Sequence, residues 1–357
     1  MRIGFEVTPL TSPHSGIGTY AANLLEHLVR RNGDVILPLS PQTGGRLRLN
    51  KTVWMQTVLP WALAGDRVDV CHFTNNVAPM YVPCPVVMTI HDMTLWLCPE
   101  HHPRQRLLAM RPVIPLAARR AAAIITVSQS AKRDIVRLLG VAESKVHVVY
   151  EAPAAQFRPL PRGPALDSLR RQYGLPEHIV LYVGTIEPRK NLVRLLHAFA
   201  RLPTANASAR ALVLVGARGW KDSSVFQTVD QLGLGERVRF LGQVPIETLV
   251  GLYNLADVLA FPSLYEGFGL PIVEAMACGT AVVTSRSGSL GEIAGNAAEF
   301  VEPTDTDSIA HGIQRVLDDD AWRTELRRRG RVRAGAFSWA EAAAQTVSVY
   351  RSATRTH

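Results

Sequence analysis

Short apolar runs rich in β-branched residues recur along the whole chain and alternate with longer helical or loop stretches. In the first half they occupy residues 2–7, 34–39, 68–73, 86–91, 123–127 and 146–150, and in the second half residues 179–183, 211–215, 238–241, 257–261 and 281–284. Strands that alternate with helices indicate βαβ units and therefore parallel sheets. The pattern predicts an α/β fold with two doubly wound, Rossmann-like sheets.

A proline-rich stretch separates the two halves. Residues 151–164 contain four prolines and no apolar periodicity, which is the composition of a linker. A chain of 357 residues with 47% hydrophobic content is long enough for two cores, whereas a single domain of this size would be unusual. We predict one domain at residues 1–160, a second at residues 161–335, and a terminal segment at residues 336–357, with a cleft between the two domains.

The most informative local feature is the run FPSLYEGFGLPIVEAMACG at residues 261–279. Pro271 suits the first position of a helix, because no intrahelical partner is needed there, and Gly279 suits its end. Glu266 precedes this helix, and we expect Glu274 in its first turn. Both glutamates could simply complement the helix dipole. Their place after an apolar strand favours a ligand site, since ligands bind outside the carboxyl ends of strands in open α/β sheets.

The start of this helix should also bind an anion. The first backbone amides of a helix have no partner within it and carry partial positive charge. We therefore expect the amides of Phe268, Gly269 and Leu270 to approach a phosphate. In the same interpretation, Glu266 holds a sugar, and Glu274 accepts hydrogen bonds from two ribose hydroxyls.

The run at residues 261–279 resembles the E-x7-E signature of the family 4 retaining glycosyltransferases, which are nucleotide-sugar enzymes of the GT-B fold. The resemblance extends over almost the whole chain. It implies two Rossmann-like domains that face a cleft, a last helix near residues 339–350 that crosses back to the first domain, and transfer of a hexose with retention. It also implies that the loop at residues 242–245, including Val244, reads the nucleotide base through backbone groups.

A second motif, VLYVGTIEPRKN at residues 180–191, runs from a strand into a helix. Arg189 and Lys190 could neutralise the charge that develops on a diphosphate leaving group, although basic pairs near helix starts are usually just solvated. Many members of the resembled family carry an arginine directly after the glycine of this strand. This chain has Thr185 after Gly184, so Arg189 could substitute. The variant resembles a subgroup that includes bacterial mannosyltransferases of surface-polysaccharide pathways.

Two further candidate positions lie in the first half. Gly16 and Gly18 follow the first strand and precede a helix expected at residues 19–30, where their amides could approach a phosphate or the acceptor, or could only form a tight turn. His91 and Asp92 end an apolar strand, a place that suits ligand contact as well as simple capping. The resemblance implies that the glycine loop lines the cleft and that His91 contacts the donor sugar.

Charge and cysteine content indicate which kinds of ligand and partner the chain could bind. The net charge of +9 permits acidic partners, but the arginine run at residues 323–333 lacks interleaved aromatics and predicts a solvated helix face, not a nucleic-acid site. The four cysteines form no C-x-x-C pair, which predicts reduced thiols. The spacing of Cys98 with His91, His101 and His102 matches no zinc pattern, so we predict no metal.

No apolar run approaches the roughly 18 residues that span a bilayer, and no signal-peptide pattern opens the chain, which predicts a cytoplasmic protein. The apolar stretch at residues 53–63, which contains Trp54 and Trp61, could contact a membrane or a lipid-linked acceptor, or could pack within its domain.

Together these features predict a metal-independent, retaining hexosyltransferase without a cofactor. Its donor would be a GDP-, UDP- or dTDP-linked sugar, with GDP-mannose favoured by the resemblance. Its acceptor would be a hydroxyl of a glycan, a lipid-linked sugar or a small molecule. The alternatives are a GT-B-fold sugar-nucleotide epimerase or hydrolase, and a non-catalytic nucleotide-binding protein.

Overall fold

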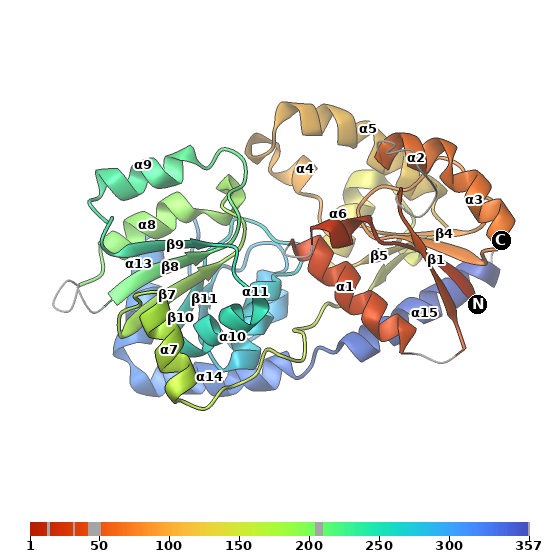
Figure 1. The fold of residues 1–357 in the computed structure, drawn as a ribbon. Helices are drawn as coiled ribbons and strands as arrows, with labels where there is room; N and C mark the ends of the chain where they lie inside the picture. Colours follow the sequence, from red (N-terminus) through yellow and green to blue (C-terminus); the bar gives the residue numbers. More distant parts are fainter. Residues whose placement is uncertain (13–14, 31–32, 42–50, 204–209, 356–357) are drawn as a thin grey trace. The chain divides into compact units, whose positions relative to one another are not determined.

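A computed structural model describes residues 1–12, 15–30, 33–41, 51–203 and 210–355 (Figure 1). The chain divides into two compact units. Unit 1 comprises Met1–Glu151 together with Ser338–His357, and unit 2 comprises Ala152–Phe337. The first division point falls at the start of the linker predicted at residues 151–164.

Unit 1 is built on a parallel sheet of six strands in the order β2-β1-β3-β4-β5-β6. The strands are β1 (Arg2–Glu6), β2 (Val35–Leu39), β3 (Val70–Phe73), β4 (Val86–Thr89), β5 (Ala123–Thr126) and β6 (Val146–Val148). The helices are α1 (Gly16–Val29), α2 (Lys51–Thr57), α3 (Leu59–Asp66), α4 (Thr94–Leu97), α5 (Arg104–Arg120), α6 (Gln129–Leu139) and α15 (Trp339–Arg355).

The last helix belongs to unit 1 although it follows unit 2 in the sequence. α15 packs against α1 and against β3, β4 and β5. Its buried face includes Ala343, Val347 and Tyr350, the three residues expected to share one face. The Tyr350 hydroxyl lies 2.7 Å from Nδ1 of the buried His72, on β3. The predicted return of the last helix to the first domain is confirmed.

Unit 2 repeats the plan with a second parallel sheet, in the order β12-β11-β10-β7-β8-β9. The strands are β7 (His178–Val183), β8 (Arg210–Val215), β9 (Val238–Gly242), β10 (Val258–Phe261), β11 (Ala281–Thr284) and β12 (Glu299–Phe300). The helices are α7 (Pro164–Gln172), α8 (Leu192–Ala200), α9 (Ser223–Gln231), α10 (Ile246–Leu255), α11 (Leu270–Cys278), α12 (Leu290–Ala294), α13 (Thr306–Asp318) and α14 (Asp320–Ala334).

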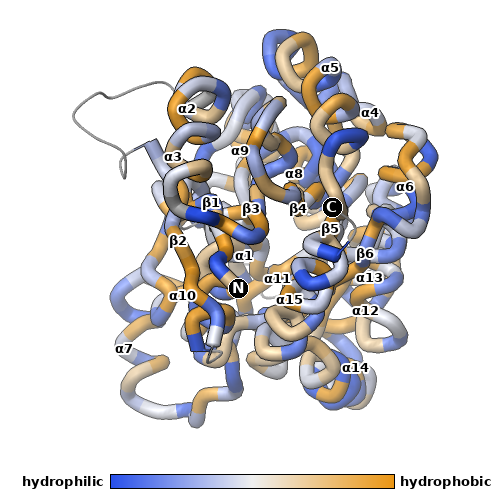
Figure 2. Tube along the Cα trace, turned by 90° about the vertical axis from the view of Figure 1, so that its right-hand side faces the viewer, coloured by the Kyte–Doolittle hydropathy of each residue, from blue (hydrophilic) through white to orange (hydrophobic). Residues whose placement is uncertain are grey.

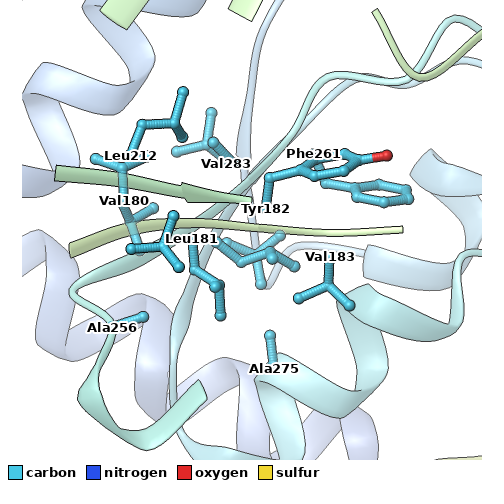
Figure 3. Close-up of a cluster of buried hydrophobic side chains, with 14 of the residues drawn as sticks. Val180, Leu181, Tyr182, Val183, Leu212, Ala256, Phe261, Ala275 and Val283 are labelled. Atoms are coloured by element: carbon cyan, nitrogen blue, oxygen red, sulfur yellow. The ribbon is translucent and has the colours of Figure 1, made fainter. Parts of the chain in front are cut away.

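Fully buried strands form the core of unit 2. Val180, Leu181 and Tyr182 of β7 pack with Phe261 of β10 and Val283 of β11 (Figure 3). Because helices cover both faces of a parallel sheet, its strands read as continuous apolar runs in place of alternating ones. This is why these strands could be located from the sequence, whereas the two-residue β12 was missed.

Several local predictions need correction. α1 begins at Gly16, not at residue 19, because the Ser15 side chain accepts a hydrogen bond from the Gly18 amide and caps the helix there. β4 ends at Thr89, so His91 lies just beyond the strand. In the apolar stretch at residues 53–63, Trp54 packs in the core, whereas Trp61 is 80% exposed.

The arginine run of α14 is only partly a solvated face. Figure 2 shows hydrophilic and hydrophobic segments intermixed along this helix. Arg323 donates to the Leu317 carbonyl at 2.8 Å, and Arg333 donates to the carbonyls of Ile293 and Glu292, both at 2.8 Å. These arginines bind backbone carbonyls of unit 2, so the prediction of a merely solvated face was wrong for them.

We expect Tyr350→Phe to destabilise unit 1 by about 1–3 kcal/mol, because a buried ring nitrogen of His72 loses its hydrogen-bond partner. Hydrogen exchange as a function of urea would measure the change at β3, with β8 of unit 2 as an internal reference. The matched control is Tyr81→Phe, at a tyrosine of the same unit that is 73% exposed. Equal exchange at β3 in both variants would contradict a structural role for the Tyr350 hydroxyl.

Candidate functional site

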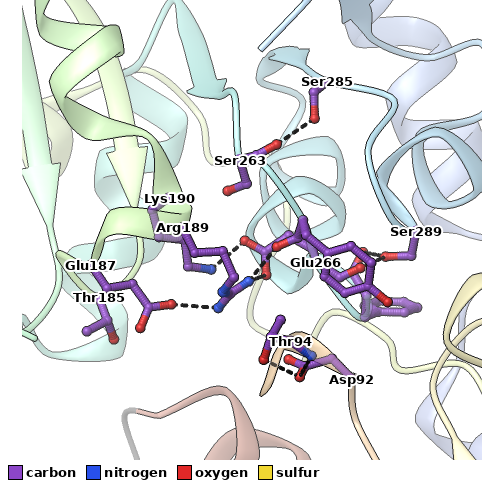
Figure 4. Close-up of polar contacts among 12 residues, drawn as sticks. Asp92, Thr94, Thr185, Glu187, Arg189, Lys190, Ser263, Glu266, Ser285 and Ser289 are labelled. Carbon is purple, nitrogen blue, oxygen red and sulfur yellow. Dashed lines mark hydrogen bonds and ion pairs between the residues drawn. The ribbon is translucent and has the colours of Figure 1, made fainter. Parts of the chain in front are cut away.

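The candidate site in unit 2 lies where neighbouring strands end. β7, β10 and β11 are adjacent in the parallel sheet, so the loops that follow them meet at the same edge. These loops cover residues 184–191, 262–269 and 285–289. Figure 4 shows their polar side chains pointing toward one another.

The loop after β10 leads into α11 through a left-handed residue. Gly269 has φ of 103° and occupies the position before the helix. The helix begins at Leu270, and Pro271 is its second residue. Gly279, with φ of 77°, ends it after two to three turns as predicted. Glu274, however, lies beyond the first turn, because the helix starts four residues before it; our placement of this carboxylate in the first turn was wrong.

Glu266 forms the centre of a buried ion-pair cluster. Lys190 Nζ lies 2.6 Å from Glu266 Oε1, and Arg189 Nη1 lies 2.7 Å from Glu266 Oε2. The second terminal nitrogen of Arg189 binds Glu187 Oε1 at 2.6 Å, and Nη1 also donates to the Tyr265 carbonyl. The structure therefore brings together Arg189, Lys190 and Glu266, which were predicted separately from two motifs.

The two cations control the protonation of the cluster. Burial by itself would raise the pKa of Glu266, but the charges of Arg189 and Lys190 and their hydrogen bonds lower it to about 2. Glu266 is therefore ionised at neutral pH. Burial, and next the charges of Glu266 and Glu187, raise the pKa of Tyr182, which stays protonated and donates to the Thr185 carbonyl at 3.1 Å.

Gly184 ends β7 in a conformation that other residues rarely adopt. Its φ is 148°, and a Cβ atom there would lie 2.8 Å from the Tyr182 hydroxyl. The backbone thus turns sharply toward Thr185 and the short 3₁₀ helix Pro188–Lys190. This turn places Lys190 next to Gly184 and directs both cations toward the loop of Glu266.

Glu274 occupies a separate, mostly buried position on α11. Its Oε2 accepts a hydrogen bond of 2.9 Å from the Tyr253 hydroxyl, on α10. Burial, and then the nearby Glu274 charge, raise the pKa of Tyr253, so this hydroxyl remains a donor. Val244, in the turn between β9 and α10, packs against the core. The ribose and base contacts assigned to these two residues stay predictions.

Three supporting residues escaped the sequence analysis. Glu187 lies within the motif at residues 180–191. Its negative charge two residues before Arg189 could have indicated that the two side chains form an ion pair. Ser289 follows β11, and its hydroxyl donates to the carbonyls of Glu266 (3.0 Å) and Phe268 (2.9 Å), which fixes the loop before α11. Tyr253 lies in an ordinary amphipathic helix that gives no local sign of a contact with Glu274.

In unit 1, His91 is held from several sides. Its backbone amide donates to Asn76 Oδ1 at 3.0 Å, and its Nε2 lies 2.9 Å from the Thr74 carbonyl oxygen. Its Nδ1 lies 3.5 Å from a carboxylate oxygen of the buried Glu151. Neither the carboxylate nor the amide was expected from the sequence, since both lie far from His91 along the chain.

The other predicted residues of unit 1 have local structural roles. Asp92 Oδ1 accepts hydrogen bonds from the Thr94 amide at 3.0 Å and hydroxyl at 2.6 Å, so the capping interpretation describes its visible contacts. The Gly18 amide is used by Ser15, and a Cβ atom at Gly18 would lie 2.2 Å from the Ser12 carbonyl oxygen. Gly18 therefore permits close packing at the start of α1, whereas Gly16 has open space.

Metal-ligating side chains gather at one place in the described part of unit 1. Cys98, Glu100 and His101 bring one potential ligand atom each within 4.8 Å of one another. The absence of a metal thus stays a prediction. Within the described residues, no helix is long and apolar enough to cross a membrane.

Comparisons with known proteins extend over both units. Residues 14–152 match the family model described as Glycosyltransferase Family 4, and residues 167–333 match the model described as Glycosyl transferases group 1. The chain is 33% identical to the O-antigen chain mannosyltransferase B of Escherichia coli, over 98% of this chain and all of that protein. It is 31% identical to the serotype-specific mannosyltransferase WbdA of Escherichia coli, over 76% of this chain but only 34% of that longer protein.

A solved structure shares the fold. The sucrose-phosphate synthase of Thermosynechococcus elongatus superimposes with a TM-score of 0.77 and 24% identity, over 98% of both chains. This likeness supports the predicted architecture of two Rossmann-like domains, and the GT-B fold class is confirmed.

The low pKa of Glu266 predicts acid sensitivity. Because the pKa falls from 4.5 to about 2 on folding, the ionised carboxylate stabilises the fold at neutral pH, and this contribution is lost as pH falls from about 4.5 toward 2. At about 1.4 kcal/mol per pKa unit, it amounts to about 3 kcal/mol. Glu266→Gln should therefore lower the melting temperature clearly at pH 7 and much less at pH 3.

Calorimetry at both pH values would measure this difference. The control is Glu236→Gln, at an exposed glutamate of the same unit. A destabilisation by Glu266→Gln that is as large at pH 3 as at pH 7 would show that the ion pairs do not stabilise the ionised form.

Proposed function

The chain belongs to the family 4 glycosyltransferases, and from this premise we propose that it moves a mannosyl residue from GDP-mannose to a hydroxyl of a glycan or lipid-linked acceptor, with retention. Glycosyl transfer itself follows from the family. The donor, the acceptor and the stereochemical course are the proposal, together with the roles of individual residues.

The cluster of Arg189, Lys190 and Glu266 carries the proposal. Glu266 holds the two cations side by side next to the turn at Gly184, at the carboxyl ends of β7 and β10. In glycosyl transfer from a nucleotide sugar, the bond from sugar C1 to the phosphate oxygen breaks and charge develops on the diphosphate. Cations that are fixed beforehand stabilise such charge without reorganising.

The remaining donor contacts follow from the same edge of the sheet. In our proposal the amides of Gly269 and Leu270, at the start of α11, bind a donor phosphate, since the helix dipole and the amide hydrogens act together there. Glu274 accepts one hydrogen bond from Tyr253, which orients its carboxylate. In our proposal this oriented carboxylate binds the two ribose hydroxyls of the donor.

The names of the relatives support the choice of mannose. The protein that is 33% identical over nearly the whole chain is a mannosyltransferase of O-antigen chains, and WbdA is also a mannosyltransferase. Neither name states the nucleotide. GDP is proposed because of the subgroup that the Gly184-Thr185 variant resembles, and a UDP-linked or dTDP-linked donor is the alternative that an experiment must exclude.

We further propose retention without a metal. The acceptor hydroxyl attacks C1 from the face that the diphosphate leaves, its oxygen forms the new bond, and its proton passes to a phosphate oxygen of the leaving group. Arg189 and Lys190 supply the positive charge that a divalent cation would otherwise supply. Neither an epimerase nor a hydrolase is favoured, because the relatives are transferases along the full chain.

We expect GDP-mannose and GDP to raise the melting temperature of the protein, because a ligand that binds only the native state stabilises it, and the stabilisation grows with the logarithm of the ligand concentration once this exceeds Kd. UDP-glucose, ADP-glucose and dTDP-glucose should raise it much less. Glu274→Gln should weaken the shift by GDP and by GDP-mannose alike, since both carry the ribose.

Differential scanning fluorimetry across concentrations would give these shifts. Glu247→Gln is the matched control, because Glu247 is an exposed glutamate on α10 of the same unit. A selective response to uridine nucleotides would replace GDP by UDP in the proposal, and an equal response of the Glu274→Gln and wild-type proteins would remove the ribose role.

Transfer from GDP-mannose to a mannoside acceptor should give an α-linked product, the configuration of the donor. The rate should be the same in EDTA as in Mg²⁺, because fixed protein cations neutralise the diphosphate. Proton NMR of the product gives the anomeric configuration. A β-linked product would refute retention, and loss of turnover in EDTA that Mg²⁺ restores would refute metal independence.

A further inference from the structure

His91 and Glu151 form a pair of titratable side chains inside unit 1. Glu151 is the last residue of the first segment of unit 1 and is only 4% exposed. Its carboxylate lies 3.5 Å from His91 Nδ1, while His91 Nε2 lies 2.9 Å from the Thr74 carbonyl oxygen. Both ring nitrogens of His91 therefore face acceptor atoms of unit 1.

These contacts determine where the protons are. A carbonyl oxygen can only accept, so His91 Nε2 must carry a hydrogen. If Glu151 were ionised and His91 neutral, the lone pair of Nδ1 would face a buried carboxylate, which is repulsive. The remaining arrangements are an imidazolium next to a carboxylate, or a neutral ring that accepts from a protonated carboxyl group. Both contain one proton more than the two groups would hold separately at neutral pH.

The surroundings favour retention of this proton. The Tyr20 ring, on α1, packs edge-on against His91 with centroids 4.8 Å apart, and it excludes water from that side. Burial raises the pKa of Glu151, while its interaction with His91 opposes this change. Three further titratable groups are uncharged: burial lowers the pKa of His72 to about 3, and burial raises the pKa of Tyr20 and of Tyr350 above their ordinary values. Two carboxyl groups have partners of their own, since Asp92 accepts from Thr94 and Glu6 accepts from the Thr74 amide.

We propose that Glu151 is a positioning residue for His91, and that the two side chains share one additional proton which fixes the imidazole ring between Glu151 and Thr74. This inference rests on the proposed function and on the contact between His91 and the donor sugar that the family resemblance implies. The shared proton keeps the pair electrically neutral, so no buried negative charge stands next to His91 when an anionic donor binds. The ring has one orientation, which is the condition for a precise contact with a sugar hydroxyl.

Nitrogen-15 NMR of the histidine rings tests the shared proton directly. At pH 7 the Nδ1 signal of wild-type His91 should be that of a ring nitrogen in a hydrogen bond that contains the shared proton, whereas in Glu151→Ala it should be that of a bare ring nitrogen. His72 serves as an internal reference, since its pKa of about 3 keeps it neutral at pH 7. A wild-type His91 whose Nδ1 gives the signal of a bare nitrogen would overturn the proposal.

Turnover with the donor tests the positioning role. Glu151→Ala should lower kcat by about 10- to 100-fold, the size expected for a misplaced reactive contact, with a smaller change in KM for the donor. Glu151→Gln should retain most of kcat, because its amide can donate to Nδ1 as a protonated carboxyl group would. Glu143→Gln, at an exposed glutamate of the same unit, is the control and should match the wild type.

The two proposals fail in different ways. If the wild-type protein neither binds nor uses any nucleotide sugar, the proposed function fails, while the NMR experiment still decides whether the proton is shared. If the wild type transfers the sugar and Glu151→Ala does so at the same rate, Glu151 is not a positioning residue. Melting temperatures of all variants separate this effect from unfolding. If the Ala variant unfolds, a folded Glu151→Gln variant that loses kcat by more than 10-fold would also overturn the proposal, because its amide still donates to Nδ1.

Discussion

The ion pairs of Glu266 connect the parts of the candidate donor site. One carboxylate binds Lys190 and Arg189, and thereby joins the loop after β7 to the loop after β10. A buried carboxylate of this kind is stable only while both partners remain, because removal of one leaves an uncompensated charge. A diphosphate that approaches these cations must therefore compete with Glu266 and Glu187 for them. The unliganded protein keeps its cations in place by binding them to its own carboxylates.

The residues of this site were predicted from two separate sequence motifs, and the fold brings them into contact. The parallel strands were found because they are buried on both faces, and the start and end of α11 were found because Pro271 and Gly279 have local conformational reasons to be there. Ser289 and Tyr253 were not found, since their contacts depend on which strands and helices are neighbours. α1 begins three residues earlier than predicted, because the Ser15 side chain caps the helix there. α11 begins one residue before the predicted Pro271, directly after the left-handed Gly269.

Unit 1 contains a chain of hydrogen bonds inside its core. Tyr350 contacts His72, His72 contacts Thr89 at 2.7 Å, and Thr89 contacts the Tyr20 hydroxyl at 3.0 Å. Buried polar groups are costly unless each one has a partner. These hydrogen bonds fix the positions of α15 and α1 relative to β3 and β4. Tyr20 in turn packs against His91. The position of the candidate sugar-contacting ring is thereby connected to the packing of the last helix.

The discontinuity of unit 1 has a consequence for synthesis on the ribosome. Residues 1–151 emerge first, but the helix that covers part of their sheet follows only after all of unit 2. Until then the buried sites of Trp339, Val347 and Tyr350 have no occupant, and apolar surface of the nascent chain stays open to chaperones. Unit 2 is continuous in sequence and can fold as soon as residue 337 has left the exit tunnel. The order of folding should therefore be the reverse of the order of synthesis, with the first unit completed last.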